Sequence, residues 1–185
     1  MSKVKNKEQL RDAHFTGKEK ERFENTSFVH CSFDDLSNLS FLDCEFRNCD
    51  LSNLNTRNTR LQNVSFFDCK LLGLNFSGAI DFALELHFEN CLMNYATFDR
   101  KKLNRSSFKN CRLHQANFTQ ADLSKSSMER CDLMEAQFME TNLSTLDFTS
   151  NVNFLIDPEQ NTLKKTKFLT GQLQNLLYRH DIIIE

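Results

Sequence analysis

A five-residue period runs through most of this sequence, and it limits the folds that the chain can adopt. From Leu86 onward the third residue of successive five-residue blocks is large and apolar, as in LHFEN, CLMNY, ATFDR, KKLNR and SSFKN, and the first is mostly small. The same pattern runs from Leu39 through Phe76. Neither the 3.6-residue turn of an α-helix nor the two-residue alternation of a β-strand sustains such a period. We therefore predict a solenoid of stacked repeats.

The repeating block is a small residue, a polar residue, Leu or Phe, and two polar residues, and it resembles the consensus of the pentapeptide-repeat family. The resemblance covers about Phe23 to Phe154. It implies an all-β fold, the right-handed quadrilateral parallel β-helix, in which four blocks make one square coil. Positions one coil apart would then stack at about 4.8 Å, the spacing between paired strands.

On this basis we divide the chain into three parts. We expect residues 1–22 to form a polar N-terminal segment and cap, and residues 23–154 to form the β-helix. Residues 155–185 would form a C-terminal cap with a short α-helix and a dimerisation tail.

The core centres can be arranged into columns that run along the solenoid. Phe98, Phe118 and Phe138 form one column, and a second contains Leu103, Leu123 and Leu143. A third column requires two extra residues between Phe76 and Phe88, and its members are Phe46, Phe66, Phe88, Phe108, Met128 and Phe148. We also predict a three-residue insertion between Phe33 and Phe41, in the segment DDLSN at 34–38, which would bring Phe23 into the third column.

The segment SGAIDFALELH at 77–87 interrupts the period in mid-chain. Loops that project from a solenoid often carry recognition, which makes Asp81, Phe82 and Glu85 candidate contact residues. A tolerated bulge without a role in binding remains the alternative. Asp81 and Lys101 both fall near inward columns, so the two residues either form an ion pair or the bulge turns Asp81 outward.

No residue pattern points to catalysis, to a cofactor or to a metal. The seven cysteines include no Cys-x-x-Cys pair. Five of them fall into one column, where stacked Cβ atoms about 4.8 Å apart suit small buried thiols better than disulfides. The scattered histidines and the absence of a nucleophile elbow or phosphate loop favour a non-enzymatic protein. The five column members are Cys49, Cys69, Cys91, Cys111 and Cys131.

The N-terminal residues and the cysteines bear on where the protein is located. Residues 1–24 contain no apolar run of the kind found in signal peptides, and no stretch approaches the length of a membrane span. Seven cysteines without a secretion signal favour a reducing compartment. We therefore expect a cytoplasmic protein without membrane contact.

The C-terminal residues predict a subunit interface. Thr170 is the expected N-cap of a helix over residues 171–180. More apolar residues follow than one end of a solenoid needs for its cap, which favours a homodimer, although a monomeric cap remains the alternative. The predicted interface residues are Leu173, Leu176, Leu177, Ile182, Ile183 and Ile184.

Charge is segregated along the chain although the net charge is only −2. Arg100 to Arg112 is basic, whereas the following coils are acidic. An acidic band beside a dimer junction is the arrangement expected of a protein that mimics duplex DNA. The residues of the predicted partner-binding band are Asp122, Glu129, Asp132, Glu135 and Glu140.

The repeat, its interruptions and the helical C-terminal end also resemble the Qnr-type quinolone-resistance proteins within the pentapeptide-repeat family. That resemblance implies a bacterial protein that binds DNA gyrase or topoisomerase IV and protects it from quinolones. One alternative is a protein-interaction scaffold or self-immunity factor with another protein partner. Another is direct nucleic-acid binding through Arg100 to Arg112. None of these functions requires a small-molecule substrate.

Overall fold

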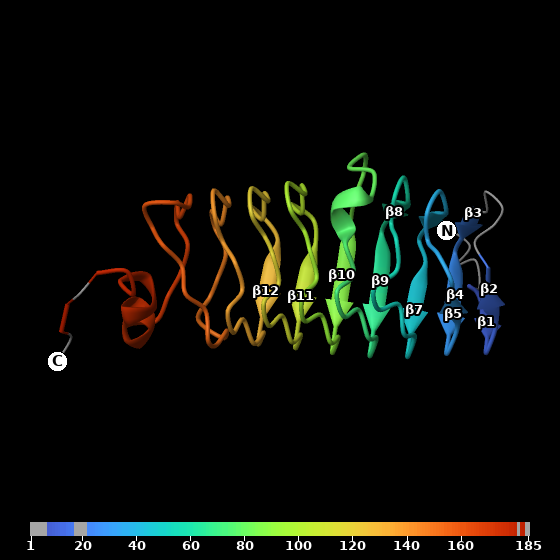
Figure 1. Cartoon of the computed structure of the whole chain (residues 1–185), viewed down its shortest axis with the longest axis horizontal. Helices are drawn as coiled ribbons and strands as arrows, with labels where there is room; N and C mark the ends of the chain where they lie inside the picture. The colour runs from blue at the N-terminus through green and yellow to red at the C-terminus, as the bar shows by residue number, and fades with distance from the viewer. Residues whose placement is uncertain (1–6, 17–21, 181, 184–185) are drawn as a thin grey trace, which may run out of the picture.

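The computed structural model describes residues 7–16, 22–180 and 182–183, and in them the chain winds into a parallel β-solenoid. Figure 1 shows the coils following one another in single file, from β1 at one end to a helical segment at the other. This arrangement confirms the fold class that the five-residue period predicts.

Three ladders of parallel strands run along the rod. The longest joins β1 (Glu8–Arg11), β4 (Thr26–Val29), β7 (Glu45–Arg47), β9 (Val64–Phe67), β10 (Leu86–Glu89), β11 (Ser107–Lys109) and β12 (Ser127–Glu129). A second joins β3 (Arg22–Glu24), β6 (Ser40–Leu42) and β8 (Arg60–Gln62), and a third joins β2 (His14–Phe15) and β5 (Ser32–Phe33). Elsewhere single parallel bridges continue the pairing, as far as Asp147 with Lys167.

Coil pairing extends beyond both ends of the region that the repeat covers. On the N-terminal side, β1 pairs with β4 and β2 pairs with β5, so paired strands precede residue 23. On the C-terminal side, Asn142 bridges to Thr162 and Asp147 bridges to Lys167. Backbone groups make these contacts, so the coils can continue where the side-chain consensus has already faded.

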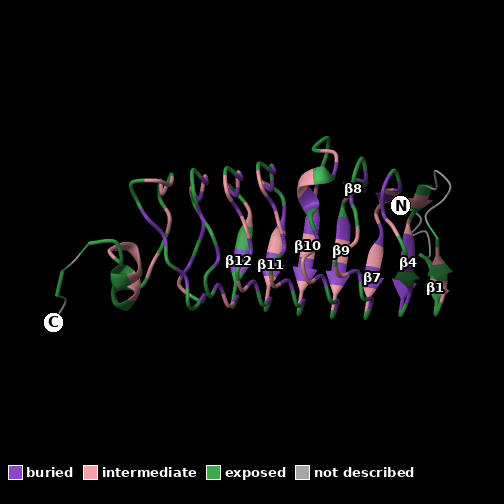
Figure 2. Ribbon diagram, viewed as in Figure 1, coloured by how far each residue is buried: buried purple, intermediate pink, exposed green. Residues whose placement is uncertain are grey.

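Stacked phenyl rings fill the rod in the predicted columns. The ring centroids of Phe66 and Phe88 are 5.1 Å apart, as are those of Phe88 and Phe108. In the neighbouring column Phe118 stacks on Phe98 at 5.0 Å and on Phe138 at 5.3 Å. Figure 2 shows the burial that results, with buried residues along the coils and exposed residues at many of their tips. The Leu103, Leu123 and Leu143 column is likewise buried.

The predicted insertion between Phe33 and Phe41 is wrong. Phe23 pairs with Phe41 and Phe28 pairs with Phe46, so the coil is two residues shorter than twenty rather than three longer. Leu36 explains the difference, because it is buried and its N–H bonds to the carbonyl of Asn55, which makes it a core centre only three positions after Phe33.

The two extra residues predicted before Phe88 are confirmed, because Phe66 pairs with Phe88. The insertion lies late in the interrupted segment: Ile80 N–H still bonds to Thr59 O, whereas Leu86 already pairs with Val64. A short 3₁₀ helix, η1 (Phe76–Gly78), precedes it. In Figure 1 this green segment projects beyond the other coils.

The C-terminal helical segment differs from the expected α-helix. It is a 3₁₀ helix, η2 (Thr170–Leu176), so Thr170 is its first residue and not its N-cap. Gln172 explains the position: its side-chain oxygen accepts a hydrogen bond from Leu169 N–H, and its amide nitrogen donates to the carbonyls of Phe148 and Asn151. These bonds tie the helix to the last coil. Among the described residues, no helix has the length and apolarity to cross a membrane.

Candidate functional site

The cysteines lie buried inside the rod, and five of them form one column. All seven are free and buried, and their thiols donate to backbone carbonyl oxygens, as Cys69 does to Phe46 at 3.4 Å. Cys91 also donates to the carbonyl of Phe66 at 3.4 Å. Interaction with the neighbouring thiols, together with burial, raises the pKa of Cys49, Cys91 and Cys131, whereas interaction with the neighbouring thiols lowers the pKa of Cys69 and Cys111. In the described part of the chain no group of three or more potential metal ligands comes together.

The five acidic residues of the predicted band encircle the rod instead of forming a stripe along one side. Glu129 lies in β12, and Asp132 lies on the next side of the coil, where it bridges to Arg112. Glu135 and Glu140 occupy two further corners, each with a positive φ. Asp122 belongs to the preceding coil.

Hydrogen bonds orient these carboxylates. Asp132 accepts hydrogen bonds from His114 Nε2 at 2.7 Å and from Asn153 at 2.8 Å. Asp122 accepts from Asn104 at 2.9 Å and from the backbone of Ser124 at 3.0 Å. Partial burial acts to raise the pKa of Asp122 and Asp132, but the hydrogen bonds outweigh it, and both pKa values lie below the ordinary aspartate value. The two carboxylates therefore stay ionised at neutral pH.

The outermost acids, Glu135 and Glu140, extend the corner columns of the preceding coil. Gln115 donates to Glu135, and Gln120 donates to Glu140 at 2.7 Å. Both glutamates are exposed. Together with Glu129, they are the exposed members of the predicted band, which a partner could reach without disturbing the fold.

The basic residues between Arg100 and Arg112 also surround the rod. Arg100 sits at a corner and donates to Gln120, whereas Lys109 lies in β11 and pairs with Glu89 at 2.6 Å. Arg112 is on a third side, bridged to Leu92 and Asp132. Arg100, Lys109 and Arg112 thus lie on different sides of the coil, which does not favour the nucleic-acid-binding alternative.

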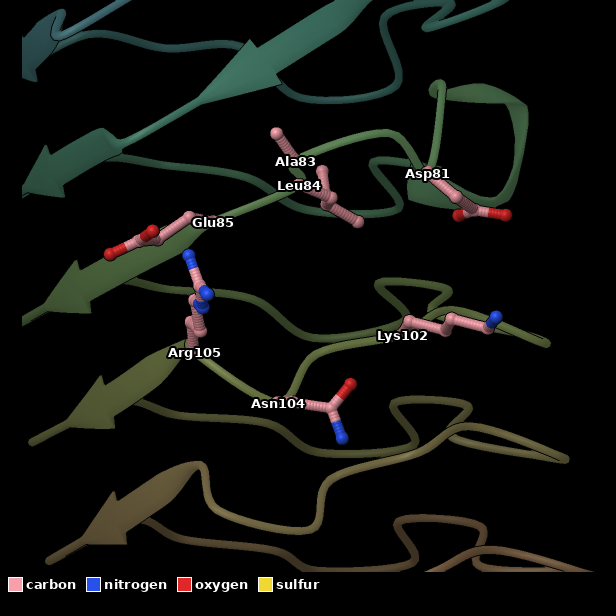
Figure 3. Close-up of a pocket in the computed structure, with 7 residues that line it drawn as sticks. All are labelled: Asp81, Ala83, Leu84, Glu85, Lys102, Asn104 and Arg105. Carbon is pink, nitrogen blue, oxygen red and sulfur yellow. The ribbon is translucent and has the colours of Figure 1, made fainter.

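The projecting segment forms the most distinctive local geometry. Lys101 and Asp81 pair at 2.8 Å while the Asp81 side chain stays half exposed, so both alternatives raised by the sequence hold together. Phe82 is 73% exposed at the loop tip. Between loop and rod lies an open cleft of about 370 Å³, where Figure 3 shows Arg105 extending from the rod towards Glu85. The cleft residues are Asp81, Ala83, Leu84, Glu85, Lys102, Asn104 and Arg105.

Exposed apolar side chains gather near the C-terminal end. Of the predicted interface residues, Leu173 is 46% exposed, Ile182 is 54% exposed and Ile183 is 90% exposed. Leu176 instead packs against the core, and Leu177 is half-buried. Ile184 lies outside the described residues.

Comparison with protein families agrees with this geometry. The chain matches the model for pentapeptide repeats over residues 44–80 and the model for the pentapeptide repeat region over residues 101–178. The chain belongs to the pentapeptide-repeat family.

Two solved structures of trypsin-treated variants of QnrB1, a plasmid-mediated fluoroquinolone resistance protein, share the pentapeptide-repeat fold with this chain. One has a TM-score of 0.68 at 21% identity, and the other has 0.66 at 22%. Each match covers 97% of this chain and 98% of the QnrB1 chain. A comparison with curated proteins finds no significant match.

Some surface features of this pentapeptide-repeat protein escaped the sequence analysis. Lys102 and Arg105 line one side of the cleft, whereas the sequence indicated only that they belong to a basic segment. Met139, Leu155 and Tyr178, each more than 40% exposed, add to the apolar end and line a cavity of about 240 Å³ there. Apolar residues at polar positions of the repeat were the available signal for Met139.

Proposed function

We propose that this pentapeptide-repeat protein acts without catalysis, by presenting its rod surface to a type II topoisomerase, DNA gyrase or topoisomerase IV, in the cytoplasm. The binding would protect the enzyme from fluoroquinolones. Two facts support the proposal: the chain shares a fold over nearly its whole length with QnrB1, a fluoroquinolone resistance protein, and it carries a concentrated acidic coil.

The acidic coil is the observation that carries the proposal. Residues 128–147 contain five carboxylates and a single cation, Arg130. Because the carboxylates encircle the coil, a basic groove that closes around the rod would meet negative charge on every side. Duplex DNA presents negative charge to such a groove in the same way. The acids are Glu129, Asp132, Glu135, Glu140 and Asp147.

The proposed active form is a homodimer joined through the C-terminal apolar surface, the one containing Leu173 and Ile182. Two copies joined there would bring both acidic coils close to the centre of one long rod. We propose that the loop residues Asp81, Phe82 and Glu85 make a second contact with the same partner, since Phe82 is exposed at the tip of a projecting segment.

The test is a gyrase supercoiling assay with a fluoroquinolone, in which the purified protein is titrated. Wild type should restore supercoiling. The double variant Glu135→Lys, Glu140→Lys should need at least about tenfold more protein, because it replaces negative charge by positive charge at two exposed corners.

A matched control comes from two corner acids in earlier coils. Asp43 accepts a hydrogen bond from Asn63 at 2.7 Å, and Asp68 accepts one from Asn90 at 3.1 Å, and both have a positive φ, as Glu140 does. The variant Asp43→Lys, Asp68→Lys makes the same change in charge and should keep its protective effect. Equal loss in both double variants would reject a specific role for the acidic coil. If wild-type protein did not restore supercoiling, a type II topoisomerase would be rejected as the partner. The protein would then be a scaffold or self-immunity factor with another partner.

A further inference from the structure

Lys101 is a charged residue inside the rod, at a position where the neighbouring coils hold small neutral residues. It precedes the bridge residue Lys102, just as Ala121 precedes Asp122 and Thr141 precedes Asn142. All three side chains are buried, and that of Lys101 is only 5% exposed. A buried ammonium group is costly unless it is paired, so its partners indicate what it does.

Both partners of the ammonium group belong to the projecting segment. Lys101 Nζ donates to the carbonyl oxygen of Ala79 at 2.7 Å and to Asp81 Oδ1 at 2.8 Å. Ala79 and Asp81 flank Ile80, the last residue that keeps the regular twenty-residue pairing before the insertion. Lys101 therefore holds the chain at the point where the loop leaves the rod.

The other end of the loop is held by ordinary core contacts. Leu84 is buried, Leu86 pairs with Val64, and Leu86 N–H donates to Ser106 Oγ at 3.2 Å. Between these two anchors only a few residues remain, and they include the exposed Phe82. The position of Phe82 therefore depends on the hold at Asp81.

We propose that Lys101 is a positioning residue, a buried latch that fixes the loop of residues 77–85 and so presents Phe82 to a protein partner with an apolar pocket. Exposed aromatic anchors held in one conformation are the residues that dominate many protein interfaces. A flexible loop would lose entropy on binding, whereas the latched loop has already lost it. The partner contact rests on the proposed function, but the latch itself does not.

Limited proteolysis with chymotrypsin measures how firmly Lys101 holds the loop, because the enzyme cleaves after aromatic residues and Phe82 is exposed. The variant Lys101→Met replaces lysine by an uncharged side chain of similar length. Cleavage after Phe82 requires the loop to open locally, so in this variant it should be about tenfold faster than in wild type under native conditions. Mass spectrometry identifies the cut. No acceleration would overturn the proposal.

Thr141 provides the matched control. It occupies the equivalent position two coils further along, is fully buried, and donates its hydroxyl to the carbonyl of Phe118 at 2.8 Å. Thr141→Ala should lower the urea midpoint of unfolding yet leave cleavage after Phe82 close to the wild-type rate. If Thr141→Ala accelerated that cleavage as much as Lys101→Met does, the effect would be general instability, and the latch would be rejected.

A second variant and a second readout keep the proposal testable. If Lys101→Met does not fold, Asp81→Asn keeps the shape of the side chain and weakens only the ion pair, and its cleavage should be severalfold faster. In the gyrase assay, a folded Lys101→Met protein should lose rescue. If wild-type protein does not rescue gyrase, the topoisomerase proposal fails, while the cleavage rates still decide the latch.

Discussion

At most corners of the described coils one residue takes a positive φ, a conformation that glycine and asparagine adopt most easily. Asparagine and aspartate occupy many of these corners in the first half of the rod, and several bond to one another along the axis, as Asn63 does to Asp43. Later corners hold bulkier residues, and Thr145, with φ of 69°, is β-branched. These later corners store backbone strain.

Replacing that threonine should therefore stabilise the protein. Thr145→Asn should raise the free energy of unfolding by about 1 kcal/mol, because asparagine tolerates the left-handed region better than a β-branched residue does. Urea unfolding followed by circular dichroism measures the change. Thr119→Asn is the control, since Thr119 has no positive φ and should gain nothing. Equal gains at the two positions would contradict the strain argument.

The structural elements of this rod are its columns of side chains rather than its short strands. Phe118 is fully buried and stacks on the rings of Phe98 and Phe138. Its ring centroid also lies 5.9 Å from that of Phe108, in a T-shaped arrangement. Phe118→Ala should lower the free energy of unfolding by about 3–5 kcal/mol, because it removes buried apolar area and leaves a cavity. Phe82→Ala removes the same ring from an exposed site and should change stability by less than about 0.5 kcal/mol. Comparable losses would mean that Phe82 also packs in solution.

The columns also show where a periodic sequence predicts an element and where it does not. The two extra residues before Phe88 were predicted because the flanking columns are long and regular. Between Phe33 and Phe41 the separation is eight residues, which fits either one block plus three residues or two blocks minus two. Only the burial of Leu36 and the pairing of Phe28 with Phe46 decide between them.

For the whole molecule, the exposed apolar end predicts self-association. Sedimentation velocity of wild type should show a dimer that dissociates on dilution. Leu173→Arg should shift the protein to monomer, because it places a charge in the proposed interface. Phe82→Arg changes an exposed apolar residue on the loop and should leave the dimer intact. If wild type sedimented as a monomer at all concentrations, the proposed dimer would be wrong, and the exposed apolar residues would belong to the interface with another partner.

The sequence by itself determined the solenoid, its core columns from Leu39 onward and the buried thiols, because each depends only on a residue's place within a five-residue block. Surface arrangement depends in addition on how the coils stack, and only the tertiary structure decided it. The acids of residues 128–147 surround the rod because successive blocks turn corners. Lys101 points inward where the Ala79 carbonyl and the Asp81 carboxylate lie within hydrogen-bonding distance of its ammonium group. A buried charge is tolerated only where such partners exist, and the block pattern alone does not reveal them.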